Sequence, residues 1–524
     1  MICLSLANCC FIRVWGNVLL FRDPPVWLKT IPGPLDEAAV MTAVLLLGAL
    51  LFGALRLARR HLPDRGFRVA RFLSFALLAV PINGQRETVK TLWLSLRSAL
   101  FGPAGRGAGL VLLALALAAV LWFAWKRERM IAVTLGRVLL ALSPFCLLTF
   151  GEAAWAMASY HGQPFSDGPL APRLDSAPPL RVVWIIYDEW DYRLSFVDRS
   201  ANLAMPEIDR LRGESLFAAA ARPPGADTDV SLPSFLTGRR LLAFKDASGG
   251  GVLTRPPDDR RAAGTPWTER GTVFSAVRES GFNVGLVGWF LPYCRVMNGD
   301  LSECAWWPVP FQGNSTTDSV LAGILGTGFW GRVGGYSASL LETYGWRTPL
   351  GQSSPVRQKA RIYPEILAAS RKDVADPSLG LVFLHVPVPH APHPYSRFTG
   401  RMDRTGGPMD GYIDSLALLD RMMGDLRTTM ERAGVWDRSV LLISADHPFR
   451  SSRELDGKSD WRVPFLLRIP GPQAAGVIST EFNTIVTANL ICAILRGQVP
   501  TAPDAAAWIE RHHADRESPV ETRD

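Results

Sequence analysis

Residues 181–191, RVVWIIYDEWD, decide the fold of this chain. The stretch is a run of β-branched and apolar residues that ends abruptly in carboxylates, which is typical of a buried parallel strand with polar groups at its carboxyl end. The pattern recurs at residues 281–290 (GFNVGLVGWF), 379–390 (LGLVFLHVPVPH) and 439–449 (SVLLISADHPF), with helical stretches such as 206–220 and 409–434 in between. Strands alternating with helices predict an α/β sandwich with a polar site at the strand ends.

The first third of the chain is apolar enough to predict a membrane domain. Residues 38–55, 108–125 and 131–150 are each long enough to cross a hydrocarbon core of about 30 Å as helices. Two weaker segments, 2–21 with Arg13 inside and 72–84 with Pro81, would bring the total to five spans. A cleaved signal peptide is the alternative for the first segment, but its arginine and the lack of a clear small-residue cleavage site argue against it.

The distribution of charge predicts orientation and excludes one class of partner. The chain carries 56 basic and 48 acidic residues, a net charge of +8; residues 1–160 hold 17 basic and 7 acidic residues, which leaves 39 and 41 for the remainder. A nucleic-acid enzyme would place its positive charge on the catalytic domain, so a nucleic-acid partner is not expected. The basic stretches at 56–71 and 126–129 should be cytoplasmic, which places the chain after about residue 160 outside. The loop at 85–107 is also basic and weakens this topology, unless it lies as an amphipathic helix in the interface.

Cysteines and prolines add detail to this organisation. Cys294 and Cys304 share a polar loop and are predicted to form a disulfide, as in an oxidising compartment, while no Cys-x-x-Cys spacing indicates cysteine-bound zinc. Residues 161–180 hold five prolines and no apolar period, which indicates a linker. The predicted parts are a membrane domain at 1–155, a linker at 156–180, a catalytic domain at 181–505 and a polar tail at 506–524. We expect a multi-pass protein of a bacterial inner membrane, with the catalytic domain on the periplasmic or extracellular side.

Two predicted strand ends carry residues that bind metals. Asp188 and Glu189 follow the first strand, and Asp446 and His447 follow the last. Carboxylate oxygens and one imidazole that converge at a sheet edge could bind a divalent cation. The alternative is that these residues merely cap loops, but two such clusters at the ends of two apolar strands argue against coincidence.

A threonine between these clusters is a candidate nucleophile. Thr228 lies in ARPPGADTDVSLPSFLTGRR, residues 221–240, just before a helix start predicted at 231–233. The dipole at a helix N-terminus and a nearby cation both stabilise an alkoxide, so such a hydroxyl can act as a nucleophile. On local grounds alone, Thr228, Asp229 and Ser231 are equally good helix caps.

Taken in order, these stretches resemble the landmarks of the alkaline phosphatase superfamily, specifically its sulfatase-like branch. The resemblance covers about residues 181–500 and implies a sandwich with a mixed, mostly parallel central sheet. Sulfatases carry CxPSRxxxLTG, whose cysteine becomes formylglycine, and alignment of the shared LTG places Thr228 at that cysteine. The TxxSxP spacing from Thr228 to Pro233 is similar to that of the phosphoethanolamine transferases, whose threonine takes up the transferred group. Lipoteichoic acid synthases also use threonine, and both families join five N-terminal spans to an outward-facing catalytic domain.

The resemblance implies roles for the matched residues. One divalent metal would be bound by Asp188 or Glu189 together with Thr228, Asp446 and His447, and the imidazole favours zinc or manganese over magnesium or calcium. Thr228 would be the nucleophile. Three further residues would serve the substrate: His390 would stabilise the transferred group or protonate the leaving oxygen, and His393 and Lys458 would bind substrate. A structural histidine and a solvated lysine are the alternatives for the last two.

Departures from the family pattern limit the substrate prediction. Leu232 replaces the arginine of CxPSR, and the KWH-like element expected near residues 285–294 is missing, so the formylglycine route is not expected. The sequence after His447 also lacks a further histidine of the phosphoethanolamine transferases, so their specific donor and acceptor are not carried over.

The resulting hypothesis is a membrane-bound, metal-dependent transferase. It would move a phosphoethanolamine- or phosphoglycerol-type headgroup from a phospholipid or other phosphodiester donor, through Thr228, to a glycan or lipid acceptor in the envelope. One alternative is a membrane-bound phosphoesterase or sulfatase-like hydrolase that uses water. A second alternative is a degenerate, non-enzymatic module.

Overall fold

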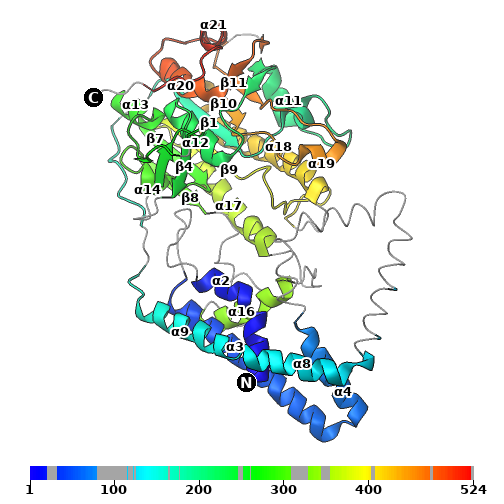
Figure 1. Cartoon of the computed structure of the whole chain (residues 1–524). Helices are drawn as coiled ribbons and strands as arrows, with labels where there is room; N and C mark the ends of the chain where they lie inside the picture. Colours follow the sequence, from blue (N-terminus) through cyan, green and yellow to red (C-terminus); the bar gives the residue numbers. More distant parts are fainter. Residues whose placement is uncertain are drawn as a thin grey trace. The chain divides into compact units, whose positions relative to one another are not determined.

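The computed structural model of the chain forms two compact units (Figure 1). It describes residues 1–19, 32–78, 125–162, 166–175, 178–245, 252–259, 261–308, 328–343, 354–402, 408–471 and 476–520, together with positions 115 and 122. The N-terminal unit contains the described residues up to 162 together with 328–343. The catalytic unit contains the other described residues from 166 onward.

The N-terminal unit is helical over its described residues. Its helices are α1 (Ile2–Cys10), α2 (Ile12–Leu19), α3 (Pro34–His61), α4 (Asp64–Ala76), α8 (Glu128–Ala141), α9 (Pro144–Ala158) and α16 (Phe329–Thr343). Two of these stretches, Pro34–His61 and Glu128–Ala158, are long and apolar enough to cross a membrane. They contain the predicted spans at 38–55 and 131–150.

The other predicted spans are not confirmed. Within the predicted segment 2–21, the described residues 2–19 form α1 and α2, helices of nine and eight residues on either side of Phe11. At 1.5 Å per residue each is about 12–14 Å long, too short to cross a hydrocarbon core. Of the segment at 72–84 only residues 72–78 are described, and of 108–125 only positions 115, 122 and 125.

The catalytic unit combines strands and helices. Its strands are β1 (Arg181–Tyr187), β2 (Leu216–Ala218), β3 (Ala221–Arg222), β4 (Leu242–Lys245), β5 (Val252–Arg255), β6 (Thr265–Pro266), β7 (Asn283–Trp289), β8 (Glu303–Trp307), β9 (Leu379–Val386), β10 (Ser439–Ala445), β11 (Phe465–Arg468), β12 (Gly476–Ile478) and β13 (Phe482–Asn483). Its helices are α10 (Tyr192–Phe196), α11 (Pro206–Gly213), α12 (Thr228–Thr237), α13 (Val273–Glu279), α14 (Tyr293–Val296), α17 (Ser354–Ala375), α18 (Pro408–Arg432), η3 (Trp436–Arg438), α19 (Ser452–Asp456), η4 (Thr484–Val486), α20 (Thr487–Leu495) and α21 (Ala502–His512).

The main sheet has eight strands in the order β12-β2-β11-β10-β1-β9-β7-β8. The five strands from β10 to β8 are mutually parallel, and β11 pairs antiparallel with both β10 and β2. All four apolar stretches singled out in the sequence are therefore neighbouring central strands. The predicted mixed, mostly parallel sheet is confirmed.

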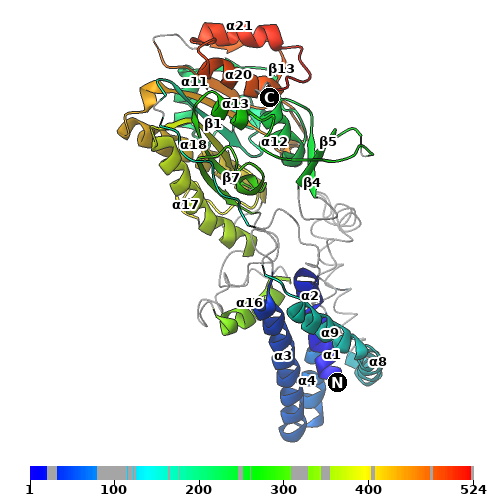
Figure 2. The ribbon, with the colours of Figure 1, turned by 90° about the vertical axis from the view of Figure 1, so that its left-hand side faces the viewer.

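Helices cover both faces of this sheet. Side chains on β1 alternate between the faces. Trp184 packs edge-on against Phe235 of α12 at 6.0 Å. Tyr187 points to the other face, where burial and the nearby Tyr363 of α17 and Asp420 of α18 raise the pKa of its hydroxyl. Figure 2 shows α17 and α18 on the side of the sheet away from α12. Burial on both faces explains why the β1 sequence is continuously apolar.

Three predicted boundaries differ from the structure. Residues 166–175 of the predicted linker lie along the catalytic unit, where Asp167 accepts a hydrogen bond from Trp306 Nε1 and Leu174 N donates to Asn283 Oδ1. Residues 328–343 pack with the N-terminal helices, because their apolar side chains are buried against α3. The predicted tail begins inside a helix, α21, which ends at His512.

The predicted disulfide between Cys294 and Cys304 is present. It joins α14, which follows β7, to the edge strand β8 across ten residues. The bond closes the loop that leads away from the carboxyl end of β7, and it is consistent with an oxidising compartment.

Candidate active site

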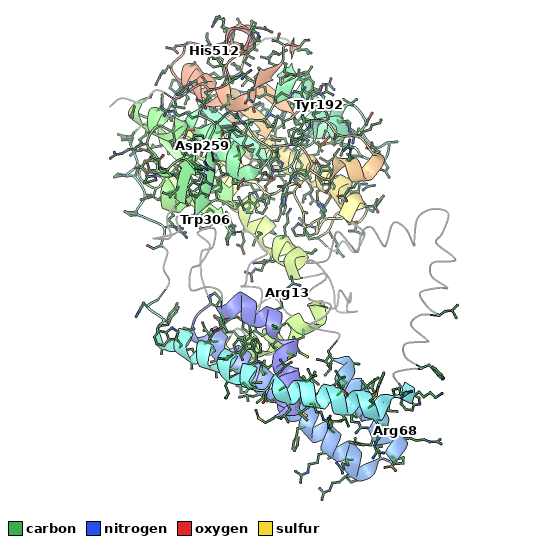
Figure 3. All side chains as sticks on the ribbon, viewed as in Figure 1. Arg13, Arg68, Tyr192, Asp259, Trp306 and His512 are labelled. Carbon is green, nitrogen blue, oxygen red and sulfur yellow. A yellow bond between two sulfur atoms is a disulfide. The ribbon has the colours of Figure 1, made fainter. Side chains whose placement is uncertain are left out.

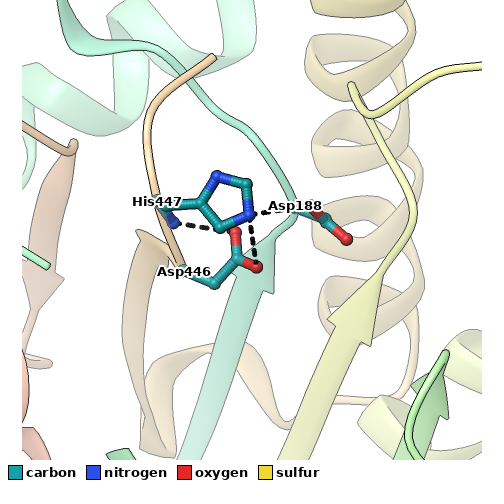
Figure 4. Close-up of side chains that lie close together, drawn as sticks. All are labelled: Asp188, Asp446 and His447. Carbon is teal, nitrogen blue, oxygen red and sulfur yellow. Dashed lines mark hydrogen bonds and ion pairs between the residues drawn. The ribbon is translucent and has the colours of Figure 1, made fainter. Parts of the chain in front are cut away.

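The metal-type residues meet because β1 and β10 are parallel and in register. Tyr187, the last residue of β1, lies opposite Ala445, the last of β10, so Asp188 and Asp446 leave the sheet side by side. The ligand atoms of Asp188, Asp446 and His447 all lie within 4.8 Å of one another (Figure 4). All three side chains are buried.

Asp188 holds one oxygen that no protein group satisfies. Its Oδ2 accepts a hydrogen bond from Trp289 Nε1 at 3.0 Å, while its buried Oδ1 has no hydrogen-bond partner. Burial, and then the neighbouring Asp446 carboxylate, raise the pKa of Asp188 well above its ordinary value. A buried carboxylate oxygen without a partner is costly, and a cation at this point would satisfy it.

Asp446 Oδ2 and His447 Nε2 face each other close to Asp188 Oδ1. Asp446 Oδ1 accepts from the backbone N–H groups of Glu189 and His447 at 3.1 and 2.9 Å. His447 Nδ1–H donates to Pro448 O at 3.0 Å, so the Nε2 lone pair points toward Asp446 Oδ2 at 3.4 Å and Asp188 Oδ1 at 3.9 Å. The hydrogen bond from Nδ1–H to Pro448 O fixes the tautomer whose Nε2 can bind a metal. The donor set therefore fits one divalent ion.

Thr228 lies at the first position of α12, directly beside this cluster. Its Oγ1–H donates to Asp446 Oδ2 at 2.7 Å and lies 3.4 Å from His447 Nε2. Helix α12 starts three to five positions before the start predicted from sequence, and its cap residue is Asp227. Thr228 is therefore not a helix cap: its hydroxyl is turned to the carboxylates, at the positive end of the helix dipole.

Glu189 is placed differently from the other predicted ligands. It takes a left-handed backbone conformation with φ of 64°, and its Oε1 accepts from Arg450 Nε at 2.8 Å. Its backbone is fixed as well, because Tyr412 O–H donates to Glu189 O at 2.7 Å. Of the alternatives Asp188 and Glu189, only Asp188 joins the three-residue cluster. A left-handed conformation in a non-glycine residue is strained, and such strain is concentrated at functional sites.

His390 lies between two cations beside the cluster. Arg450 Nη2 donates to His390 Nε2 at 3.3 Å, and the Lys359 ammonium on α17 donates to His390 O. His390 Nδ1 donates to Ala391 O, and the ring packs edge-on against Trp289 at 5.2 Å. Burial lowers the pKa of His390 to about 4. The ring is thus neutral, with its proton on Nδ1 and its Nε2 accepting from Arg450, so Nε2 carries no proton to donate.

His385, at the end of β9, is a wholly buried neighbour of Asp188. Its Nδ1 lies 2.8 Å from Tyr293 Oη, and its Nε2 is 3.8 Å from Asp188 Oδ2. Burial lowers the pKa of His385 to about 4. Tyr293 also fills the space beside Gly288, within the segment where the KWH-like element was expected, since a Cβ on Gly288 would lie 2.4 Å from the Tyr293 ring. A long basic side chain cannot be accommodated at Gly288.

The two predicted substrate-binding residues are held by other partners. His393 Nδ1 lies 3.0 Å from Ser415 Oγ, and its ring packs edge-on against Tyr412, so it is fixed against α18. The Lys458 side chain is 63% exposed and pairs with Asp198 at 3.1 Å. The structure does not bring either side chain into the three-residue cluster.

Three residues of the site were missed in the sequence. Arg450 follows Asp446 and His447 by only a few positions, so its place in the same loop was a usable signal. Trp289 is the last residue of β7, within the apolar stretch 281–290, where a side chain at the sheet edge could have been expected. Lys359 gave no signal, because nothing in a helix sequence shows that one lysine is turned inward.

The fold and the site together are those of a hydrolase- or esterase-type enzyme whose buried cluster fits a divalent metal. The chain matches the sulfatase family over residues 181–495, more than half of its length, and therefore belongs to that family. Enzymes of this family use a divalent metal, in agreement with the buried Asp-Asp-His cluster. No curated protein matches the chain.

Solved structures similar to this chain include enzymes with different substrates. A sulfatase from Pseudoalteromonas sp. has 14% identity and a TM-score of 0.41, with 65% of this chain and 73% of that chain covered. A phosphonate monoester hydrolase of Agrobacterium radiobacter has 12% identity and a TM-score of 0.37, with 60% and 74% covered. A protein in the alkaline phosphatase superfamily from Vibrio parahaemolyticus has 12% identity and a TM-score of 0.38, with 63% and 71% covered.

Proposed function

We propose that this protein transfers a phosphoryl-linked headgroup from a lipid-type phosphodiester through Thr228 to an acceptor hydroxyl. The observation that carries the proposal is the 2.7 Å hydrogen bond from Thr228 Oγ1 to Asp446 Oδ2 at the start of α12. A threonine at the sulfatase cysteine position cannot become formylglycine, so its own hydroxyl is the available nucleophile. Asp188, Asp446 and His447, with Thr228, would hold one divalent ion, which would supply Lewis-acid stabilisation of negative charge.

The residues of the chain account for the movement of the protons. Thr228 Oγ attacks the phosphorus of the donor, the bond from phosphorus to the leaving oxygen breaks, and the threonine proton passes to Asp446. The leaving oxygen takes up a proton from solvent and departs as an alcohol. An acceptor hydroxyl then attacks the same phosphorus and displaces Thr228, whose oxygen takes its proton back from Asp446, while the acceptor proton passes to solvent.

Hydrolysis is the second candidate, and membership of the sulfatase family supports it. The same residues act, but water is the acceptor. A phosphatidylethanolamine donor labelled in its headgroup distinguishes the two in membranes that contain candidate acceptors. Transfer predicts label on a glycan or lipid, whereas hydrolysis predicts only water-soluble phosphoethanolamine. No label released in either form, by metal-loaded protein, would contradict both functions.

Arg450 is expected to bind the anionic oxygens of the transferred group. Its guanidinium carries five N–H donors and directs one each to Glu189, Asp227 and His390. The side chain is 48% exposed, so the remaining donors are accessible. Arg450→Met should lower kcat/KM about 10²-fold, as removal of a transition-state donor does. Arg450→Lys, which keeps the charge without the planar fork, should recover part of this loss.

The matched control for this change is Arg453→Met. Arg453 is an exposed arginine on α19, three residues farther along the chain, and its replacement should leave kcat/KM unchanged. Steady-state kinetics with one phosphodiester substrate compares the variants. Equal losses in Arg450→Met and Arg453→Met, or full activity in Arg450→Met, would show that Arg450 does not bind the substrate.

Lys359 is expected to increase turnover, although burial of its charge lowers the stability of the folded protein. It is 2% exposed, and among the described residues its three-donor ammonium has one hydrogen-bond acceptor, His390 O. Burial lowers the pKa of Lys359 from 10.5 to about 7. Below pH 7 the lysine is protonated in both folded and unfolded chains, so the cost of burying the charge is fully present; that cost fades as the pH rises from 7 toward 10.5. Lys359→Met should therefore lower turnover about tenfold without lowering the unfolding midpoint at pH 6.

Thermal unfolding and turnover, measured side by side, test this separation. The unfolding midpoint of Lys359→Met should exceed that of the native protein by less at pH 10 than at pH 7. A midpoint that drops together with turnover at pH 6 would instead identify Lys359 as a structural residue that holds the His390 backbone.

A further inference from the structure

The chain leaves the N-terminal unit just after the end of α9. Helix α9 ends at Ala158, and the ring of Tyr160 lies 3.5 Å from the point where a Cβ on Gly33 would be. Gly33 is the residue before α3. The start of α3 and the end of α9 therefore lie together, and the chain runs from here toward the catalytic unit.

The opposite end of the unit collects the basic residues. The last turn of α3 holds Arg59 and Arg60, and Arg71 of α4 bonds Glu128, the first residue of α8, at 2.7 Å. Figure 3 labels Arg68 on α4 near this end. At 1.5 Å per residue the 28 residues of α3 span about 42 Å, enough to separate the two ends by a bilayer. The positive-inside rule makes the basic end cytoplasmic and the Gly33 end outward.

Helix α16, which lies between β8 and α17 in the sequence of the catalytic domain, packs at the outward end. Arg332 forms an ion pair with Asp36 in the first turn of α3, and Tyr336 O–H donates to the same carboxylate at 3.1 Å. Val333 and Tyr336 are buried in one cluster with apolar residues of α3. Gly331, Gly334 and Gly335 are buried in α16 too, and such small residues allow helices to approach closely in membranes.

We propose that α16 is a second membrane anchor, which lies in the lipid headgroup layer at the outward end of α3. Its 15 residues span about 22 Å, too short to cross a bilayer but typical of an interfacial helix. Trp330 is 56% exposed beside Phe329, and tryptophan favours the boundary between membrane and water. Because Arg332 is paired with Asp36, its charge does not oppose placement of the helix in the headgroup layer. The anchor is independent of the reaction that the enzyme catalyses.

Site-specific photo-crosslinking in the full chain tests the anchor. Benzoylphenylalanine replaces Trp330 in one sample and Trp461, which is 58% exposed in the catalytic unit, in the control. Each protein is reconstituted in vesicles of phosphatidylethanolamine and phosphatidylglycerol, irradiated and digested. We expect lipid adducts on the peptide at position 330 at least about fivefold more often than at 461. Equal yields at both positions, or adducts at 330 to another protein chain instead of lipid, would overturn the proposal.

A charge exchange tests whether Asp36 holds the helix in place. Arg332→Asp alone should reduce the lipid adducts at position 330, because two carboxylates would then face each other. The double variant with Asp36→Arg restores the opposite charges and should restore the adducts. If Arg332→Asp leaves the yield unchanged, or the double variant remains low while it is inserted and folded, α16 is not seated by this contact.

Discussion

Thr228→Ala is expected to lower turnover at least about 10³-fold while the protein folds and inserts normally. The hydroxyl is the group that attacks the donor, and no neighbouring side chain can replace it at 2.7 Å from Asp446 Oδ2. Folding should be little affected, because the main structural contacts of α12 are made by other residues of the helix, such as Phe235 against Trp184. Turnover of a labelled phosphodiester by purified protein, with circular dichroism as the folding control, measures both effects.

Two threonine variants sharpen this experiment. Thr228→Ser retains a hydroxyl and should keep measurable turnover. Thr237→Ala removes a buried hydroxyl from the same helix, which donates to Pro233 O at 2.7 Å and accepts from Arg239 N at 3.2 Å, and should leave turnover near that of the native protein. If Thr228→Ala retains turnover within tenfold of the native protein, Thr228 is not the nucleophile.

Asp446→Asn is expected to remove the metal and, with it, the activity. Asp446 is wholly buried and accepts hydrogen bonds from Thr228, Glu189 and His447. Burial raises the pKa of Asp446, but His447, His385 and the Thr228 hydrogen bond outweigh burial and hold that pKa below its ordinary value, so the carboxylate is charged and can bind a cation. An amide of the same shape lacks that charge. Metal content should fall from about one ion per chain to under roughly a tenth of that.

The matched control is Asp191→Asn, a buried aspartate three residues after Asp188 whose side chain caps α10. This variant should keep its metal, as measured by elemental analysis of purified protein. Chelation of the native protein should abolish turnover, and single metals added back should identify the ion, with zinc or manganese expected from the imidazole ligand. Full metal content in Asp446→Asn, or full turnover after exhaustive chelation, would contradict the site.

The sheet and the metal cluster could be predicted because they follow from local pattern. Apolar runs that end in carboxylates identify parallel strands, and parallel strands bring their carboxyl ends to one edge. The pairing of Tyr187 with Ala445 then places Asp188 beside Asp446 without further information. The disulfide was equally accessible, because only two cysteines shared a polar loop.

What could not be predicted depends on contacts between distant parts of the chain. Glu189 and Asp188 are adjacent in sequence, and only the left-handed backbone at Glu189 turns its carboxylate to Arg450 and away from the cluster. Lys359 and α16 carry ordinary helical patterns, so the buried ammonium and the packing on α3 appear only in three dimensions. The family resemblance implied that Lys458 binds substrate, yet its anionic partner is Asp198 on the surface.

Mass spectrometry of Thr228 tests the central claim most directly. Metal-loaded protein is incubated with phosphatidylethanolamine and phosphatidylglycerol vesicles without acceptor, quenched in acid and digested, and the peptide that contains Thr228 is sequenced by fragmentation. Thr228→Ser serves as the positive control and Thr228→Ala as the blank. We expect a phosphodiester or phosphate adduct located on Thr228, whose mass identifies the transferred group. Donor turnover under the same conditions with Thr228 unmodified and an adduct on another residue would contradict the proposed mechanism.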